Sequence, residues 1–217
     1  MPEGPFDVIT HVLHLALGFG AAAAALAALA ARKGGRLHRW AGWVFAAGML
    51  VAALTAWSFM VARPLPLAMI EANVAIYALG MAILALNPRW RGARAGEYAM
   101  LALLLLTMLG VAAMGVRFAL AGSPTALATL AMFAVLAFFA VLDLRYLRAG
   151  AVTRLDRVRR HVLRMALAAS ETVRAPTITF ADDLGLPVPA IVFGTFLLIP
   201  LIYYGFAPQA RRVARPA

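Results

Sequence analysis

Apolar residues in this chain fall in runs of about 20. This is the feature of the sequence that most limits which folds are possible. At a rise of 1.5 Å per residue, such a helix crosses the roughly 30 Å hydrocarbon core of a bilayer. Hydrophobic residues make up 64% of the sequence and charged residues 13%, against roughly half and a quarter in soluble domains. A membrane β-barrel would need short segments of alternating polarity instead. The sequence therefore predicts a polytopic helical membrane protein.

The net charge of +11 reflects 20 lysine and arginine residues against 9 acidic ones. A basic surface can indicate nucleic-acid binding, but here the basic residues stand mainly in loops between apolar runs, where they determine topology. We therefore expect the lipid bilayer as a partner and no nucleic acid. The absence of cysteine from the sequence excludes disulfides, thiolate metal sites and cysteine nucleophiles.

Turn signals divide the chain into seven predicted helices in a single all-α domain. At Asn87-Pro88, for example, the residue before proline disfavours the helical region. The first apolar run is expected to remain as a membrane helix, because Glu3 and Asp7 precede it without any basic residue, unlike a secretory signal. The sixth helix is the least apolar, since charges interrupt its apolar stripe. The predicted helices cover residues 8–31, 39–61, 67–87, 98–121, 124–146, 156–180 and 187–206.

The distribution of basic residues between loops predicts the orientation of these helices. Alternate connections are rich in arginine, whereas the others hold only Arg63, Arg117 or the acidic pair Asp182-Asp183. Cytoplasmic loops of membrane proteins carry the excess of basic residues. The N-terminus is therefore predicted outside and the C-terminus in the cytoplasm. The basic segments contain Arg32, Lys33, Arg36 and Arg39; Arg89, Arg91 and Arg94; Arg145, Arg148, Arg154, Arg157, Arg159 and Arg160; and Arg211, Arg212 and Arg215.

Ionisable residues inside apolar helices are costly, so each one marks a candidate site. Depth along the predicted helices sorts them into an outer and an inner layer. In the outer layer, two histidines three residues apart share a helix face and two carboxylates stand on other helices, a ligand set that suits a divalent metal. The candidate metal ligands are His11, His14, Glu71 and Glu171.

The same outer layer could instead form a pocket for a polar ligand or a proton relay. Its remaining members would be Asn73, Arg117 and Arg174. Glu171 and Arg174 are three residues apart, in the order that favours an ion pair. Mutual neutralisation of these two residues, without any further role, is the structural alternative.

The inner layer combines histidines and arginines near the cytoplasmic ends of the second and sixth helices. His38 and His161 stand on different helices at matching depth, as the two ligands of a b-type haem do. Haem propionates would pair with arginine, and the candidates are Arg39, Arg160 and Arg164. Both histidines also lie near the predicted membrane surface, where interfacial side chains extend to lipid headgroups. Haem ligation and interfacial placement both fit this pattern.

Three classes of function remain after the motif search. The chain has no His-Glu-x-x-His, P-loop or Gly-x-Ser-x-Gly motif, and its only lysine, Lys33, lies in a predicted loop, which excludes a retinal Schiff base. No catalytic residue is assigned. The classes are a membrane redox or cofactor protein with b-type haem or a divalent metal, a small-molecule transporter or ligand sensor, and an accessory membrane subunit. The corresponding partners are a quinone, another small molecule or a further membrane subunit.

The first predicted hairpin and the start of the sixth helix share a residue pattern with a known family. The residues of this pattern are His14, Gly18, Arg32-Lys33-Gly34, Leu37-His38-Arg39-Trp40-Ala41-Gly42-Trp43-Val44-Phe45, Met49, Leu54-Thr55-Ala56, Arg160-His161 and Met165. Over about residues 9–57 and, more weakly, 159–165, the chain resembles the uncharacterised bacterial membrane proteins grouped as DUF2306. The resemblance implies a bacterial cytoplasmic-membrane location and a family pattern that includes His14, His38 and His161. We also expect the sixth helix to pack on the first hairpin.

Overall fold

The computed structural model describes residues 5–62, 66–149 and 152–214. Within these ranges the chain forms helices joined by short turns, without strands. The helices are α1 (Pro5–Ala30), α2 (Arg36–Ala62), α3 (Pro66–Leu86), α4 (Ala93–Leu120), α5 (Thr125–Arg148), α6 (Arg154–Thr179), α7 (Val188–Phe196) and α8 (Leu198–Ala214). The predicted all-α class is confirmed.

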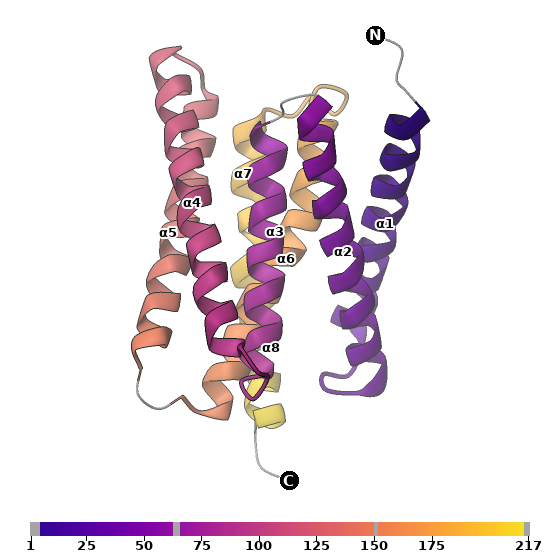
Figure 1. The fold of residues 1–217 in the computed structure, drawn as a ribbon, viewed down its shortest axis with the longest axis vertical. Coiled ribbons are helices and arrows are strands. Elements are labelled where there is room, and N and C mark those ends of the chain that lie inside the picture. Colours follow the sequence, from indigo (N-terminus) through magenta and orange to yellow (C-terminus); the bar gives the residue numbers. More distant parts are fainter. Residues whose placement is uncertain (1–4, 63–65, 150–151, 215–217) are drawn as a thin grey trace.

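The helices form an elongated bundle with a polar helix near its centre. Helices α3, α6 and α7 run through the middle, with α8 continuing from α7, while the α1–α2 hairpin and the α4–α5 pair flank them on opposite sides (Figure 1). Helix α6 packs against α1, α3, α7 and α8. The expected contact between the sixth helix and the first hairpin is present, because α6 touches α1 and the Thr172 hydroxyl lies 3.5 Å from Met49 Sδ of α2.

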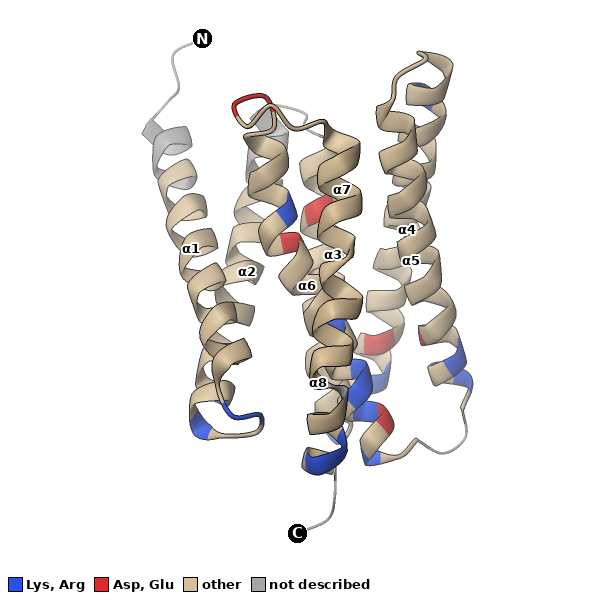
Figure 2. Cartoon of the chain, turned by 180° about the vertical axis from the view of Figure 1, so that it is seen from behind, with Lys and Arg blue, Asp and Glu red and all other residues tan. Residues whose placement is uncertain are grey.

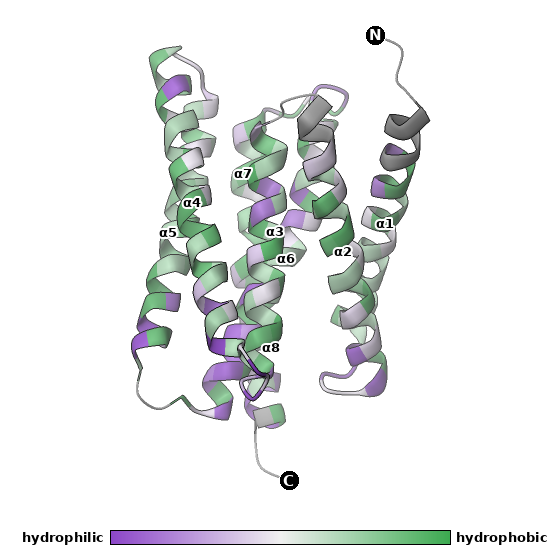
Figure 3. Ribbon diagram, viewed as in Figure 1, coloured by the Kyte–Doolittle hydropathy of each residue, from purple (hydrophilic) through white to green (hydrophobic). Residues whose placement is uncertain are grey.

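Within the residues that the structure describes, six helical stretches are long and apolar enough to cross a membrane. The last of them, Val188–Phe206, joins α7 to the first half of α8. Large apolar side chains such as Leu106 and Leu130 point outward rather than into the bundle, and Figure 3 shows mainly hydrophobic residues along α4 and α5. An exterior of this kind is suited to lipid. The protein is therefore a multi-pass membrane protein.

Helix α6 is the exception among the long helices, because its charges exclude it from that apolar set. Its charged side chains Arg160, Arg164, Glu171 and Arg174 are buried, whereas Arg154 and Asp156 at its start are exposed. The helix begins with a capping box, in which Asp156 N donates to Thr153 Oγ1 at 3.2 Å and Thr153 N donates to Asp156 Oδ2 at 3.1 Å. The buried charges of α6 therefore need polar partners within the protein, because lipid provides none.

Small residues let α1 and α2 pack closely, and one lysine stabilises the turn between them. A Cβ added at Gly48 would lie 3.1 Å from the Ala21 Cβ, so glycine permits this close helix approach. In the turn, Lys33 Nζ donates to the carbonyls of Ala28 at 2.8 Å and Leu29 at 2.6 Å, and lies 3.9 Å from the centre of the Phe206 ring. Partial burial lowers the pKa of Lys33. This lysine caps α1 and connects the hairpin to α8.

The largest differences between the predicted and the observed helix boundaries are at two places. The predicted seventh helix, 187–206, is divided at Leu197 into α7 and α8, and α8 continues to Ala214. Arg211 and Arg212 lie in its last turn, where positive charge stabilises a helix C-terminus. Helix α4 begins at Ala93 rather than at residue 98, directly after Gly92, whose φ of 82° suits the turn before it.

Candidate functional site

Two layers of buried charge lie along α6, each joined to the helices beside it (Figure 2). Arg160 and Arg164 belong to the layer near the basic end, by which we mean the end with the 31–35 and 87–92 turns and the end of α8. Glu171 and Arg174 belong to the other layer. About 15 Å of helix axis separates Arg164 from Arg174 at 1.5 Å per residue.

Asp143 of α5 is the centre of the layer near the basic end. Its carboxylate is completely buried and accepts hydrogen bonds from Arg160 Nε at 3.1 Å and Arg164 Nη2 at 2.6 Å. The Tyr77 hydroxyl of α3 also donates to it. One carboxylate therefore joins α3, α5 and α6.

Glu97 of α4 supplies the second carboxylate of this layer. It accepts from Arg160 Nη1 and, at 3.3 Å, from Arg94 Nη1. The Arg160 guanidinium also lies 3.8 Å from the centre of the Tyr146 ring. Arg160 and Arg164, predicted as partners of haem propionates, are thus bound to carboxylates of α4 and α5, whereas Arg39 is exposed.

The two predicted haem ligands lie at the basic end, each anchored to a neighbouring helix. His38 Nδ1 is 3.0 Å from the Ala28 carbonyl oxygen of α1, and His161 Nδ1 is 3.0 Å from the Ala82 carbonyl oxygen of α3. A carbonyl oxygen only accepts, so each Nδ1 carries the proton, and a neutral ring in this tautomer has its lone pair on Nε2. Both side chains are half-buried.

The other layer is a triad of Glu71, Glu171 and Arg174. Arg174 Nε donates to both Glu71 oxygens at 3.1 Å, and Arg174 Nη2 lies 3.0 Å from Glu71 Oε2. The same Nη2 donates to Glu171 Oε1. The Arg174 guanidinium lies 4.5 Å from the centre of the Phe196 ring of α7 and is inaccessible to solvent. The sequence prediction of an ion pair between Glu171 and Arg174 describes only part of this triad.

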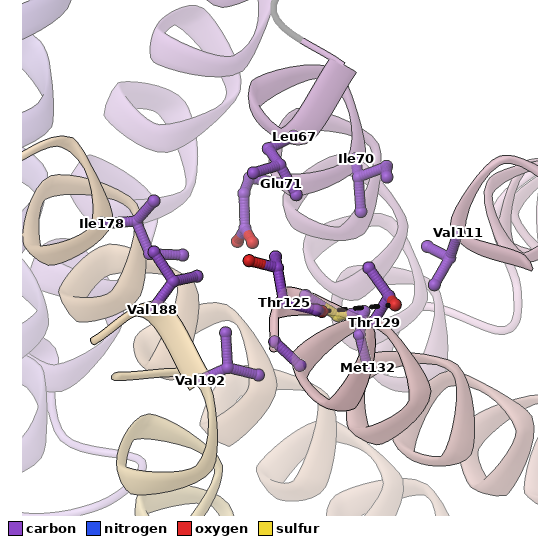
Figure 4. Close-up of a pocket in the computed structure, with 11 residues that line it drawn as sticks. Leu67, Ile70, Glu71, Val111, Thr125, Thr129, Met132, Ile178, Val188 and Val192 are labelled. Carbon is purple, nitrogen blue, oxygen red and sulfur yellow. Dashed lines mark hydrogen bonds between the residues drawn. The ribbon is translucent and has the colours of Figure 1, made fainter. Parts of the chain in front are cut away.

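A small cavity lies beside the triad. Its volume is about 20 Å³, enough for one water molecule. The Glu71 carboxylate and the Thr125 side chain point toward each other there (Figure 4), and most of the remaining wall is apolar.

The four candidate metal ligands do not form one cluster. His14 Nδ1 lies 3.0 Å from the Ala52 carbonyl oxygen and 3.0 Å from Thr55 Oγ1, both on α2, because α1 packs against α2 rather than α3. His11 is exposed. Among the residues that the structure describes, no three His, Asp or Glu side chains are arranged to hold a metal ion.

Two further residues of the predicted outer pocket lie apart from Arg174. The side-chain amide oxygen of Asn73 accepts from Trp57 Nε1 at 3.2 Å, and Arg117 is exposed at the far end of α4. From the outer set, the structure brings Glu71, Glu171 and Arg174 together.

Sequence reasoning missed Asp143, Glu97 and Tyr77 as members of the buried layer. Asp143 carried a usable signal, because it is the only charge inside an apolar run of about 20 residues. Glu97 follows three arginines and was counted with the loop. Nothing in the sequence separates Tyr77 from an ordinary core tyrosine.

Comparisons with protein-family models, curated proteins and solved structures give no match for this chain. The resemblance to DUF2306 stays a prediction based on the first hairpin and on His161.

Proposed function

We propose that this protein is a seven-span membrane protein of the DUF2306 type that binds one b-type haem between His38 and His161 and transfers electrons. In this proposal the N-terminus is outside and the basic end, with both histidines, is at the cytoplasmic side. Charge distribution supports this orientation, because the turns at the basic end hold most of the basic residues that lie outside helices.

The anchoring of both Nδ1 atoms carries the proposal. Histidines that bind a metal usually donate their second ring N–H to a backbone carbonyl or carboxylate, which fixes the tautomer and the ring orientation. His38 and His161 both have this arrangement, on two different helices and at the same end of the bundle. An interfacial histidine that only contacts headgroups has no need of such an anchor.

The bound haem would supply one-electron chemistry, and this chain would supply axial ligands and a low-polarity setting. His38 and His161 would each present Nε2. Of the three arginines predicted to pair with haem propionates, Arg39 is the one that is not bound to a carboxylate of the described chain. Arg160 and Arg164 would act at a distance, as fixed positive charge behind His161.

The test is the absorbance spectrum of the purified protein together with its haem content. We expect a Soret band, a sharp α band on reduction and about one haem per chain. His38→Ala and His161→Ala should each abolish the low-spin spectrum, and added imidazole should restore it by occupying the vacated ligand position.

His14→Ala is the matched control, since its Nδ1 is also bonded to a backbone carbonyl, at a different depth. It should retain the wild-type spectrum. A haem-free protein expressed under haem-replete conditions, or a spectrum that survives His161→Ala, would overturn the proposal.

A further inference from the structure

The Glu71–Glu171–Arg174 triad places two carboxyl groups and one guanidinium in an almost dry interior. The exposed fractions of the side chains are 10% for Glu71, 1% for Glu171 and 0% for Arg174. With both glutamates ionised, the triad would carry one uncompensated negative charge. A buried charge of this kind is removed by binding a cation or a proton.

The shared arginine nitrogen brings the two carboxyl groups together. Arg174 Nη2 lies 3.0 Å from Glu71 Oε2 and also donates to Glu171 Oε1. Two ionised carboxylates at one guanidinium nitrogen repel each other, which favours the neutral acid at one of them. A proton on one carboxyl removes the excess negative charge without any additional space.

The hydrogen-bond pattern also identifies the residue that carries the proton. Arg174 Nε bonds to both oxygens of Glu71, the arrangement that guanidinium makes with a charged carboxylate. Glu171 accepts only from Arg174 Nη2, and its buried Oε2 has no donor. Glu71 is therefore the ionised partner and Glu171 the neutral one.

We infer that Glu171, held by Glu71 and Arg174, is a proton-binding site in the half of the bundle opposite His38 and His161. Helices α5 and α7 face the triad with uncharged side chains, including Thr125, Met132 and Phe196. The charged groups that act on the pair are thus Arg174 and the two carboxyls themselves. The cavity beside Glu71 and Thr125 has room for one water molecule, through which a proton would reach the pair. The inference is independent of haem.

Infrared difference spectroscopy of the protein in lipid nanodiscs tests this assignment. At neutral pH the wild type should show the carbonyl stretch of a buried protonated carboxylic acid, which shifts downward in D2O and is lost when alkaline pH removes the proton. Glu171→Gln should lose the band while keeping wild-type thermal stability, because the uncharged amide has the shape of the neutral acid and its oxygen can still accept from Arg174.

Glu97→Gln is the matched control, because Glu97 is also buried but accepts hydrogen bonds from two arginines, Arg94 and Arg160. It should keep the band. A wild-type spectrum without the band at any pH, or a band that survives Glu171→Gln, would overturn the inference. Loss of the band on adding sodium chloride at constant pH would also overturn it, by showing that the site binds a metal cation in place of the proton.

Discussion

Asp143 shows how much one buried side chain can organise. It accepts from Tyr77, Arg160 and Arg164 and is inaccessible to solvent. In lipid-surrounded protein, a guanidinium without such a partner would lie in a medium that barely solvates it. Without Asp143, Arg160 would keep Glu97 as a carboxylate partner, whereas Arg164 would have no carboxylate partner among the described residues.

Asp143→Asn is expected to lower the free energy of unfolding by about 3–5 kcal/mol, since it removes one partner of a buried ion network while preserving shape. Titration with a denaturing detergent measures this change. Asp182→Asn is the control: Asp182 is exposed in the α6–α7 turn, and its replacement should change stability by less than about 0.5 kcal/mol. Equal effects of the two substitutions would contradict the role given to Asp143.

At the residue scale, the sequence predicts which side chains are unusual better than it predicts their partners. Glu171 and Arg174 are adjacent on one helix face, so their pairing follows from spacing alone. Two other features depend on which helices pack together. One is the place of Glu71 in the triad, and the other is the pairing of Arg160 and Arg164 with carboxylates of α4 and α5. His14 shows the same limit. Its spacing from His11 suggests a pair of metal ligands, but it does not predict the contacts of the His14 side chain with α2.

Helix α6 is the element whose charge pattern decides the architecture. Its predicted span, 156–180, agrees closely with Arg154–Thr179. The start is well defined because Thr153 and Asp156 form a complete capping box, a local signal that needs no tertiary contact. The division between α7 and α8 was not predictable in this way, since apolar residues continue across Leu197.

Thr153→Ala should lower the free energy of unfolding by about 1 kcal/mol at neutral pH. Hydrogen bonds from the Thr153 side chain and backbone N–H lower the pKa of Asp156. A carboxyl whose pKa is lower in the folded state stabilises the protein above its unfolded pKa, and that contribution is lost as the pH falls through the folded value. The stability difference should therefore shrink below about pH 4.

Stability measured at neutral and acidic pH for wild type and Thr153→Ala tests the capping box. Thr179→Ala, at the other end of the same helix, removes an exposed hydroxyl that bonds only to the Ala175 carbonyl. It should have a small effect that does not depend on pH. A pH-independent effect of Thr153→Ala would show that Asp156 takes no part in the cap.

At the scale of the whole molecule, the proposed orientation can be measured directly. The natural sequence has no cysteine, so a single introduced thiol can be labelled without a background. Trp90→Cys lies in the exposed α3–α4 turn at the basic end, and Leu184→Cys lies in the exposed α6–α7 turn at the opposite end. Neither substitution alters a charge.

In intact cells, a membrane-impermeant maleimide should label Leu184→Cys and should label Trp90→Cys only after the membrane is permeabilised, because basic turns stay in the cytoplasm. The reverse pattern would place the histidines outside. Labelling of both variants in intact cells would mean that α6 does not cross the membrane.

The order of the buried charges along the chain has a consequence for biosynthesis. Glu71, Glu97 and Asp143 all precede Arg160, Arg164 and Arg174. During synthesis at the ribosome, every carboxylate outside α6 that receives these arginines is therefore already in the bilayer when α6 leaves the translocon. We expect the early helices to act as an intramolecular chaperone for the one helix that could not partition into lipid by itself.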